Sequence, residues 1–161
     1  MSADDGEPGL RLDAYLPYRL SVASNAVSGL IARAYQDRFG LTIPQWRLIC
    51  VLAEDGPMTQ GQIVTRTFMD KVTVSRAAQG LSKRRLVDRS EHQADGRSHV
   101  LALTIEGRRL HGEIAPLALA YEAALIAGLA PEEVMLLRRL LLRLQSAATA
   151  LAGEGAPPPI G

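Results

Sequence analysis

Residues 70–104 constrain the fold of this chain more than any other segment. A basic stretch, DKVTVSRAAQGLSKRRLVDRS, is followed by a short polar segment containing Asp95-Gly96-Arg97 and then by the apolar run HVLALT. The basic stretch has helical spacing, and the apolar runs on either side of the polar segment predict the two strands of a hairpin. A helix followed by a two-stranded ribbon with an arginine at its tip is typical of a winged helix, which binds duplex DNA.

The basic helix is predicted to begin near Lys71 and to bury one of its faces. The carboxylate of Asp70 is placed to accept a hydrogen bond from the backbone of Thr73, and its charge complements the positive helix end. Small and branched apolar residues recur at the i, i+3, i+4 and i+7 positions, a spacing that puts them on one core-facing stripe. This stripe consists of Val74, Ala77, Ala78 and Leu81.

The opposite face of this helix carries cations, hydroxyls and an amide, which suit the phosphate oxygens and base edges of DNA. Arg76 is the candidate for a base contact, because a guanidinium bonds guanine O6 and N7 together. Lys71, Lys83 and Arg84 are candidates for neutralising phosphates. The alternative is a solvated charged face without a ligand. The candidate DNA-binding residues of the face itself are Lys71, Thr73, Ser75, Arg76, Gln79 and Lys83.

A shorter helix is predicted just upstream, over residues 60–67. Thr59 and Gln62 have the spacing of a capping box, in which each side chain bonds the other residue's backbone amide. Thr67-Phe68-Met69 then forms a turn of a few residues into the basic helix. Two helices joined in this way predict a helix-turn-helix whose second helix enters the major groove.

The ribbon that follows is predicted to form a wing. Leu86–Ser90 and His99–Thr104 are the expected strands, and Asp95-Gly96 is the expected turn, with the wing tip at residues 92–98. Arg97 is a candidate for insertion into the adjacent minor groove, and Asp95 is close enough in sequence to orient its guanidinium. The alternative for this pair is an ordinary surface salt bridge.

The order of these pieces resembles the multiple antibiotic resistance regulator (MarR) family of winged-helix transcription factors, over about Tyr18 to Leu151. The resemblance implies an obligate homodimer on a pseudo-palindromic operator, usually a repressor that is released by a small molecule or an oxidant. Its motifs are "GLSKRRLVDRS", "DGRS" and "LALTIEGRRL", with Asp95-x-Arg97 in the wing, Leu86-Val87-x-Arg89 at the strand entry and Leu103-Thr104-x-Glu106-Gly107 at a helix start.

The expected fold class is mainly α with a small β-wing, in one domain. Residues 15–152 form this domain, with the winged helix-turn-helix at about 42–104 and dimerisation helices at about 16–39 and 105–152. Residues 1–14 and 153–161 are expected to be flexible tails. The net charge of the chain is only +1, but residues 71–98 carry seven Lys or Arg against three Asp or Glu. A locally basic face on a near-neutral chain suits a protein that binds one DNA site reversibly.

Dimerisation is predicted from the leucines of the last helix, which exceed what one small fold can bury. In an obligate dimer these side chains pack as in a domain interior, with the first helix and the last two helices of both chains interleaved. The basic helices of the two chains, which enter the major groove, then lie about one DNA turn apart, roughly 34 Å. A monomeric bundle is the alternative. The leucines are Leu136, Leu137, Leu140, Leu141, Leu144 and Leu151.

Cys50 is the only cysteine, which excludes an internal disulfide and any multi-cysteine metal site. It shares a predicted core-facing helix side with Trp46, Ile49 and Ala53, where a thiol tends to be unreactive. An oxidant-sensing regulator acting through Cys50 is nevertheless one alternative function.

Other classes of protein have less support in the sequence. No apolar run is long enough for a membrane span and no signal peptide is indicated, so the protein is expected in the cytoplasm. His92, His99 and His111 form no catalytic or metal-binding motif, and we expect neither an enzyme nor a cofactor. A winged-helix module for protein association without DNA binding remains a second alternative.

A ligand site is expected between the dimerisation helices and the DNA-binding part, by the family resemblance. Tyr18, Arg19, Trp46 and Arg47 are the candidate effector-binding residues. The aromatic rings offer flat walls and the arginines offer partners for an anion, which favours a small aromatic carboxylate or its thioester. Trp46 has the alternative role of an ordinary core residue.

Overall fold

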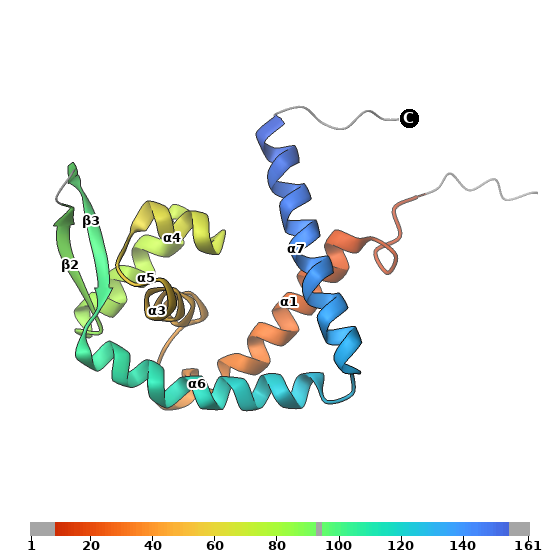
Figure 1. The fold of residues 1–161 in the computed structure, drawn as a ribbon, viewed down its shortest axis with the longest axis horizontal. Helices are drawn as coiled ribbons and strands as arrows, with labels where there is room; N and C mark the ends of the chain where they lie inside the picture. The colour runs from red at the N-terminus through yellow and green to blue at the C-terminus, as the bar shows by residue number, and fades with distance from the viewer. Residues whose placement is uncertain (1–8, 93–94, 155–161) are drawn as a thin grey trace, which may run out of the picture. The chain divides into compact units, whose positions relative to one another are not determined.

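The computed structural model describes the backbone of residues 9–92 and 95–154, and within this part the side chains of residues 91–98 and 154 are not described. It is mainly helical with one small sheet, as predicted (Figure 1). The elements in chain order are α1 (Leu16–Ala32), α2 (Gln36–Phe39), α3 (Ile43–Asp55), β1 (Met58–Thr59), α4 (Gln60–Thr67), α5 (Lys71–Lys83), β2 (Val87–His92), β3 (Asp95–Leu103), α6 (Ile105–Ile126) and α7 (Pro131–Glu154).

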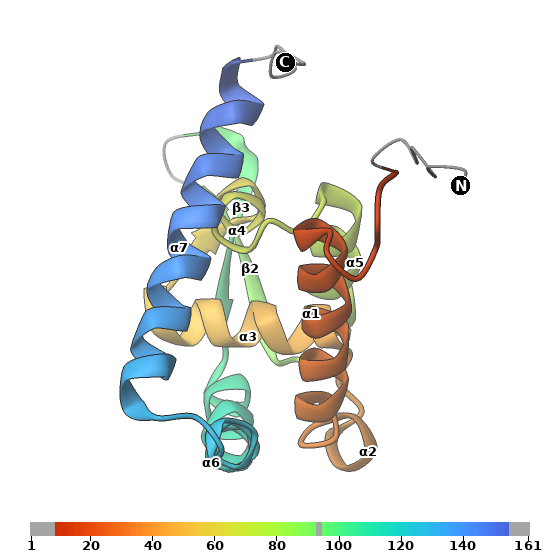
Figure 2. The same ribbon diagram turned by 90° about the vertical axis from the view of Figure 1, so that its right-hand side faces the viewer.

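The chain divides into two compact units, one ending at Tyr121 and the other beginning at Glu122. The first contains α1 to β3 and most of α6, and the second contains the end of α6 and α7. The single domain expected over residues 15–152 stays a prediction. α7 runs as one uninterrupted helix (Figure 2), and every residue from 135 to 153 is exposed.

Local capping interactions begin each helix of the helix-turn-helix. The Thr59 backbone amide donates to Gln62 Oε1 over 2.8 Å, and the Gln62 amide donates to Thr59 Oγ1 over 3.2 Å. The predicted capping box and the predicted helix over residues 60–67 are therefore confirmed. The same motif begins α3, where Thr42 and Gln45 exchange bonds of 3.0 and 3.3 Å. Each box satisfies two backbone amides that a helix end otherwise leaves free.

The core of the first unit lies between α3, α4, α5 and the small sheet. The predicted stripe of α5 is confirmed, because Val74, Ala77, Ala78 and Leu81 are all buried. On α3 the prediction was partly wrong, since Ala53 is exposed. The buried side of that helix is formed by Trp46, Leu48, Ile49 and Leu52.

The sheet has the antiparallel strand order β1-β3-β2, and its register differs from the prediction at one end. Val87 pairs with Leu103 where the ribbon leaves the core, close to the predicted strand ends. At the other end His92 pairs with Asp95, so Asp95 and Gly96 belong to β3 and do not form the predicted turn. A register shift separates the Glu91 and His92 pairs.

The first helix is shorter than predicted, because the expected helix over residues 16–39 is broken after Ala32. Residues 33–35 form a turn before the short helix α2 (Figure 2). The amides of Ala34 and Tyr35 donate to carbonyls three residues back, which tightens the chain. The turn lets Ala32, Ala34 and Tyr35 all be buried. Burial of the Tyr35 ring outweighs the propensity of the segment to continue as one helix.

Candidate nucleic-acid interface

The outer face of α5 is open and cationic. Lys71, Arg76, Gln79 and Lys83 are exposed, while Thr73 and Ser75 are half-buried. Within the part of the chain whose side chains are described, no carboxylate forms an ion pair with any of the three cations on this face. Their charge is therefore available to an anionic partner such as the phosphate backbone of DNA.

Asp70 fixes the start of α5 and also limits what Thr73 can do. Its carboxylate accepts from the Thr73 amide at 2.8 Å and from the Thr73 hydroxyl at 2.6 Å, as the predicted cap requires. The hydroxyl bond, followed by the backbone bond, lowers the pKa of Asp70 below its usual value. Since the Thr73 hydroxyl proton is committed to Asp70, its oxygen is left to accept a bond, which suits a base amino group better than a phosphate.

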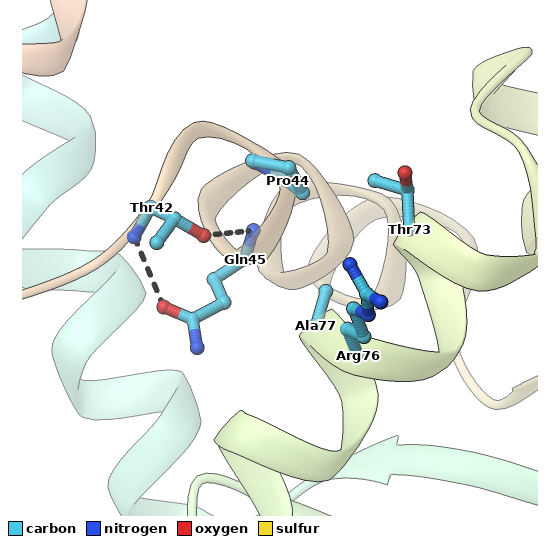
Figure 3. A pocket seen from close by; sticks show the side chains of 6 residues that line it. All are labelled: Thr42, Pro44, Gln45, Thr73, Arg76 and Ala77. Atoms are coloured by element: carbon cyan, nitrogen blue, oxygen red, sulfur yellow. Dashed lines mark hydrogen bonds between the residues drawn. The ribbon is translucent and has the colours of Figure 1, made fainter.

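A hollow of about 330 Å³ lies between the start of α3 and the outer side of α5. In Figure 3, the Arg76 side chain extends from α5 towards Pro44 and Thr73, which also line the hollow. The Arg76 guanidinium therefore lies beside the N-terminus of α3. The partial positive charge of this helix end also favours an anion. The lining residues are Thr42, Pro44, Gln45, Thr73, Arg76 and Ala77.

Arg84 has partners within the fold that the sequence did not indicate. Its guanidinium donates to the Phe39 carbonyl over 2.7 Å and to the Gly40 carbonyl over 3.1 Å. These carbonyls lie at the end of α2, where a cation satisfies free acceptors and complements the helix dipole. The arrangement favours a structural role for Arg84, tying α2 to the end of α5, over the predicted phosphate contact.

The wing pair lies partly outside the described structure. The backbone places Asp95 and Arg97 in β3, near the end of the ribbon that is farther from the core. Their side chains belong to the part that the structure does not describe, so the minor-groove contact of Arg97 and the orienting role of Asp95 stay predictions.

Two exposed apolar side chains at this surface were not among the predicted site residues. Phe68, in the turn before α5, is 64% exposed, and Val72, the second residue of α5, is 58% exposed. The sequence did contain a signal for Val72, because it lies off the buried stripe of α5. Phe68 gave no comparable signal, since a lone aromatic residue in a turn usually packs inward.

The candidate effector residues are not gathered into one site within this chain. Tyr18 and Arg19 are exposed on α1, whereas Arg47 on α3 donates to Ser28 Oγ over 3.2 Å. Ser28 lies ten residues beyond Tyr18, which corresponds to about 15 Å of helix rise. A site built from all four predicted residues therefore needs a further element.

Trp46, the fourth of these residues, is buried in an aromatic stack. Its ring lies between those of Tyr35 and His111, at centroid distances of 5.4 and 5.6 Å. Stacking of this kind stabilises a core and leaves little of the indole for a ligand. The alternative role of Trp46 as a core residue is thus the better supported one.

Cys50 is half-buried on α3. Burial, with a smaller contribution from the charge of Glu54, raises the pKa of its thiol to about 12. A thiol with this pKa stays protonated at neutral pH, and the protonated form is a poor nucleophile towards oxidants.

Two features are absent from the described residues. No three His, Cys, Asp or Glu side chains of that part gather closely enough to hold a metal ion. In the same ranges, no single helix combines the length and hydropathy needed to cross a membrane.

Comparisons with known proteins agree with this geometry. The model of the MarR family matches residues 39–98. A probable transcriptional regulator from Pseudomonas aeruginosa has a crystal structure that is 34% identical, with a TM-score of 0.72, covering 83% of this chain and 99% of that one. BpsR of Bordetella bronchiseptica, whose DNA binding is regulated by 6-hydroxynicotinic acid, is 26% identical with a TM-score of 0.77, over 85% and 97% of the two chains. The HTH-type transcriptional regulator YwoH of Bacillus subtilis (strain 168) is 29% identical over 123 residues, which cover 74% of this chain and 89% of that protein.

Proposed function

Since this chain belongs to the MarR family of DNA-binding transcriptional regulators, we propose that it is a cytoplasmic, homodimeric repressor of a pseudo-palindromic operator. We further propose that a small aromatic carboxylate or its thioester releases it from DNA. The charge of the outer face of α5 is the main support for DNA binding. On this face Lys71, Arg76 and Lys83 are exposed, and none of them forms an ion pair within the described part of the chain.

This face suits recognition of a specific DNA sequence better than nonspecific binding to DNA. Lys71 and Lys83 stand at the two ends of α5, and such lysines neutralise phosphates on either side of a groove. Arg76 lies between them and has the donors to bond a guanine at two atoms. A surface for protein association alone would be poorer in lysine and richer in packed aromatic side chains.

The exposed leucines of α7 support the homodimer. Six of them are between 39% and 51% exposed in the single chain, although burial of a leucine side chain away from water lowers the free energy. Helical geometry places Leu137, Leu140, Leu141 and Leu144 on one side of α7. A second copy of the chain covers this side and holds the two α5 helices about one DNA turn apart, roughly 34 Å.

The effector class is supported by a relative and by the candidate residues. BpsR is regulated by 6-hydroxynicotinic acid, which is an aromatic carboxylic acid. Tyr18 and Arg19 offer an exposed ring and an exposed cation at consecutive positions of α1. We propose that the ligand site is completed in the dimer, since one chain does not bring these two residues to Arg47.

The oxidant-sensing alternative is not supported by Cys50. Its raised thiol pKa disfavours the thiolate that reacts with peroxides. No specific observation therefore favours a second function.

The proposal is tested by selecting duplexes from a random library with the purified protein and then measuring affinities in a salt titration. We expect one symmetric motif to be enriched, and Arg76→Ala to lose discrimination between this motif and random duplex more than it loses total affinity. Lys83→Ala is the matched control, because loss of a phosphate contact weakens binding to both duplexes alike. Enrichment of no motif would refute the proposal. Aromatic acids and thioesters added to the same assay are expected to release the operator.

A further inference from the structure

Two large apolar side chains interrupt the polar surface of the winged helix-turn-helix (residues 42–104). Phe68 and Val72 are more than half exposed. Every other large hydrophobic side chain described in this segment is buried or half-buried. The two residues flank Asp70, the cap of α5, so both lie at the end of the helix that enters the groove in helix-turn-helix proteins.

Phe68 also has an unusual backbone conformation. Its φ of 56° lies in the left-handed region, and its amide donates to the Val64 carbonyl over 2.9 Å to end α4. Glycine or asparagine adopts this conformation at lower cost than an aromatic residue does. Packing within the chain does not compensate for the strain, because most of the ring is exposed. Strained residues that packing within the chain does not explain cluster at ligand-binding and active sites.

The surroundings of Val72 identify the kind of partner. Lys71 and Arg76 are exposed on the same helix, so the partner is anionic. In the major groove of DNA the apolar group on the base edges is the C5-methyl of thymine, and apolar side chains contact it. A protein partner is disfavoured, because the centres of protein interfaces are depleted in lysine.

We propose that Val72 recognises the 5-methyl group of a thymine in each half-site, and that Phe68 shields this contact from water. The proposal rests on the DNA-binding function proposed above and adds a specificity-determining residue to it. Val72 supplies an apolar contact, whereas Arg76 supplies hydrogen bonds. The two side chains together therefore distinguish more bases than either does alone.

Replacing thymine by deoxyuridine tests this proposal, because the change removes only the methyl group and keeps every hydrogen-bonding atom of the base edge. Each thymine of the selected operator is replaced in turn, in both half-sites. At one position we expect affinity for the wild-type dimer to fall about four-fold per half-site, or roughly fifteen-fold for the symmetric operator. With Val72→Ala, the thymine and deoxyuridine operators are expected to bind alike.

Lys71→Ala is the matched control, since it lies next to Val72 and is also exposed. This variant is expected to weaken both operators equally and to keep their affinity ratio. The proposal is overturned if no thymine position shows a penalty with the wild-type protein, or if Val72→Ala retains the penalty. A wild-type protein that prefers no duplex at all would overturn the proposed function and this inference together, whereas a preferred operator without any deoxyuridine penalty overturns this inference alone.

Discussion

Gly107 is the position where one added methyl group should disturb the fold most clearly. It is buried near the start of α6, and its amide donates to the Thr104 hydroxyl over 2.9 Å. A Cβ atom built there would lie 2.1 Å from the Leu86 carbonyl oxygen and 3.2 Å from Leu103 Cδ2. That carbonyl already accepts from the Thr104 amide over 3.1 Å, so it cannot move without loss of a hydrogen bond. Alanine at this position therefore pushes α6 away from the base of the wing.

Gly112 provides a matched control on the same helix, because a Cβ there meets no atom within 4 Å. Gly112→Ala should stabilise the protein by up to about 1 kcal/mol through helix propensity. Gly107→Ala gains the same stabilisation from helix propensity but should lose about 3 kcal/mol to overpacking, because the backbone at Leu86 or Gly107 must shift. The two variants should thus differ by about 3 kcal/mol, or roughly 6–12 °C in melting temperature.

Thermal unfolding followed by circular dichroism measures this difference. All samples need the same protein concentration, because the stability of a dimer depends on it. Equal melting temperatures for Gly107→Ala and Gly112→Ala would refute the argument that α6 is packed against the Leu86 carbonyl.

Four further predictions concern single residues. Asp70 has a lowered pKa, so its cap stabilises the fold fully above the unfolded-state pKa, and this stability is lost as pH falls through the lower folded-state pKa. Circular dichroism should therefore show a smaller acid-induced loss of helix in Asp70→Ala than in the wild-type protein. Identical acid titration curves for the two proteins would contradict this. Cys50 should react very slowly with iodoacetamide at neutral pH and faster as pH approaches 12, and fast alkylation at pH 7 would argue for a reactive thiol. Arg97→Ala should weaken operator binding and lower its salt dependence while light scattering still shows a dimer; an unchanged salt titration would remove the wing from the mechanism. Phe68→Gly should relieve backbone strain and raise the melting temperature while weakening operator binding; a gain in affinity would be the opposite of what we expect.

The dimer interface is predicted to break when Leu140 and Leu144 are both replaced by Asp. Light scattering should then show monomers or aggregates, because two buried charges in each chain oppose association. Leu142→Asp serves as the control, since Leu142 is 64% exposed and lies on the opposite side of α7. An intact dimer in the double variant would place the interface elsewhere.

Features set by near neighbours in sequence were predictable. The Asp70 cap, the Thr59–Gln62 capping box and the buried stripe of α5 each depend on residues within about two helical turns. Such patterns determine backbone geometry with little help from the rest of the chain. The start and the buried stripe of α5, which carries most of the candidate site, were therefore predicted correctly.

Features set by distant contacts were not predictable. Arg84 bonds carbonyls more than forty residues earlier, and no spacing rule connects those positions. Tyr35 ends a helix early because its ring stacks on Trp46, a contact that exists only in the folded core. The predicted register of the wing was wrong for a related reason. Asp95-Gly96 has turn propensity, but the pairing of β2 with β3 decides which residues belong to the strands.

We propose that two identical α5 helices occupy successive major grooves of one symmetric operator. Inserting five base pairs between the half-sites tests it most directly, because the change turns one half-site by about half a helical turn. We expect affinity for this operator to fall to the level of random duplex while the protein stays dimeric. Affinity that is unchanged by the insertion would contradict the claim.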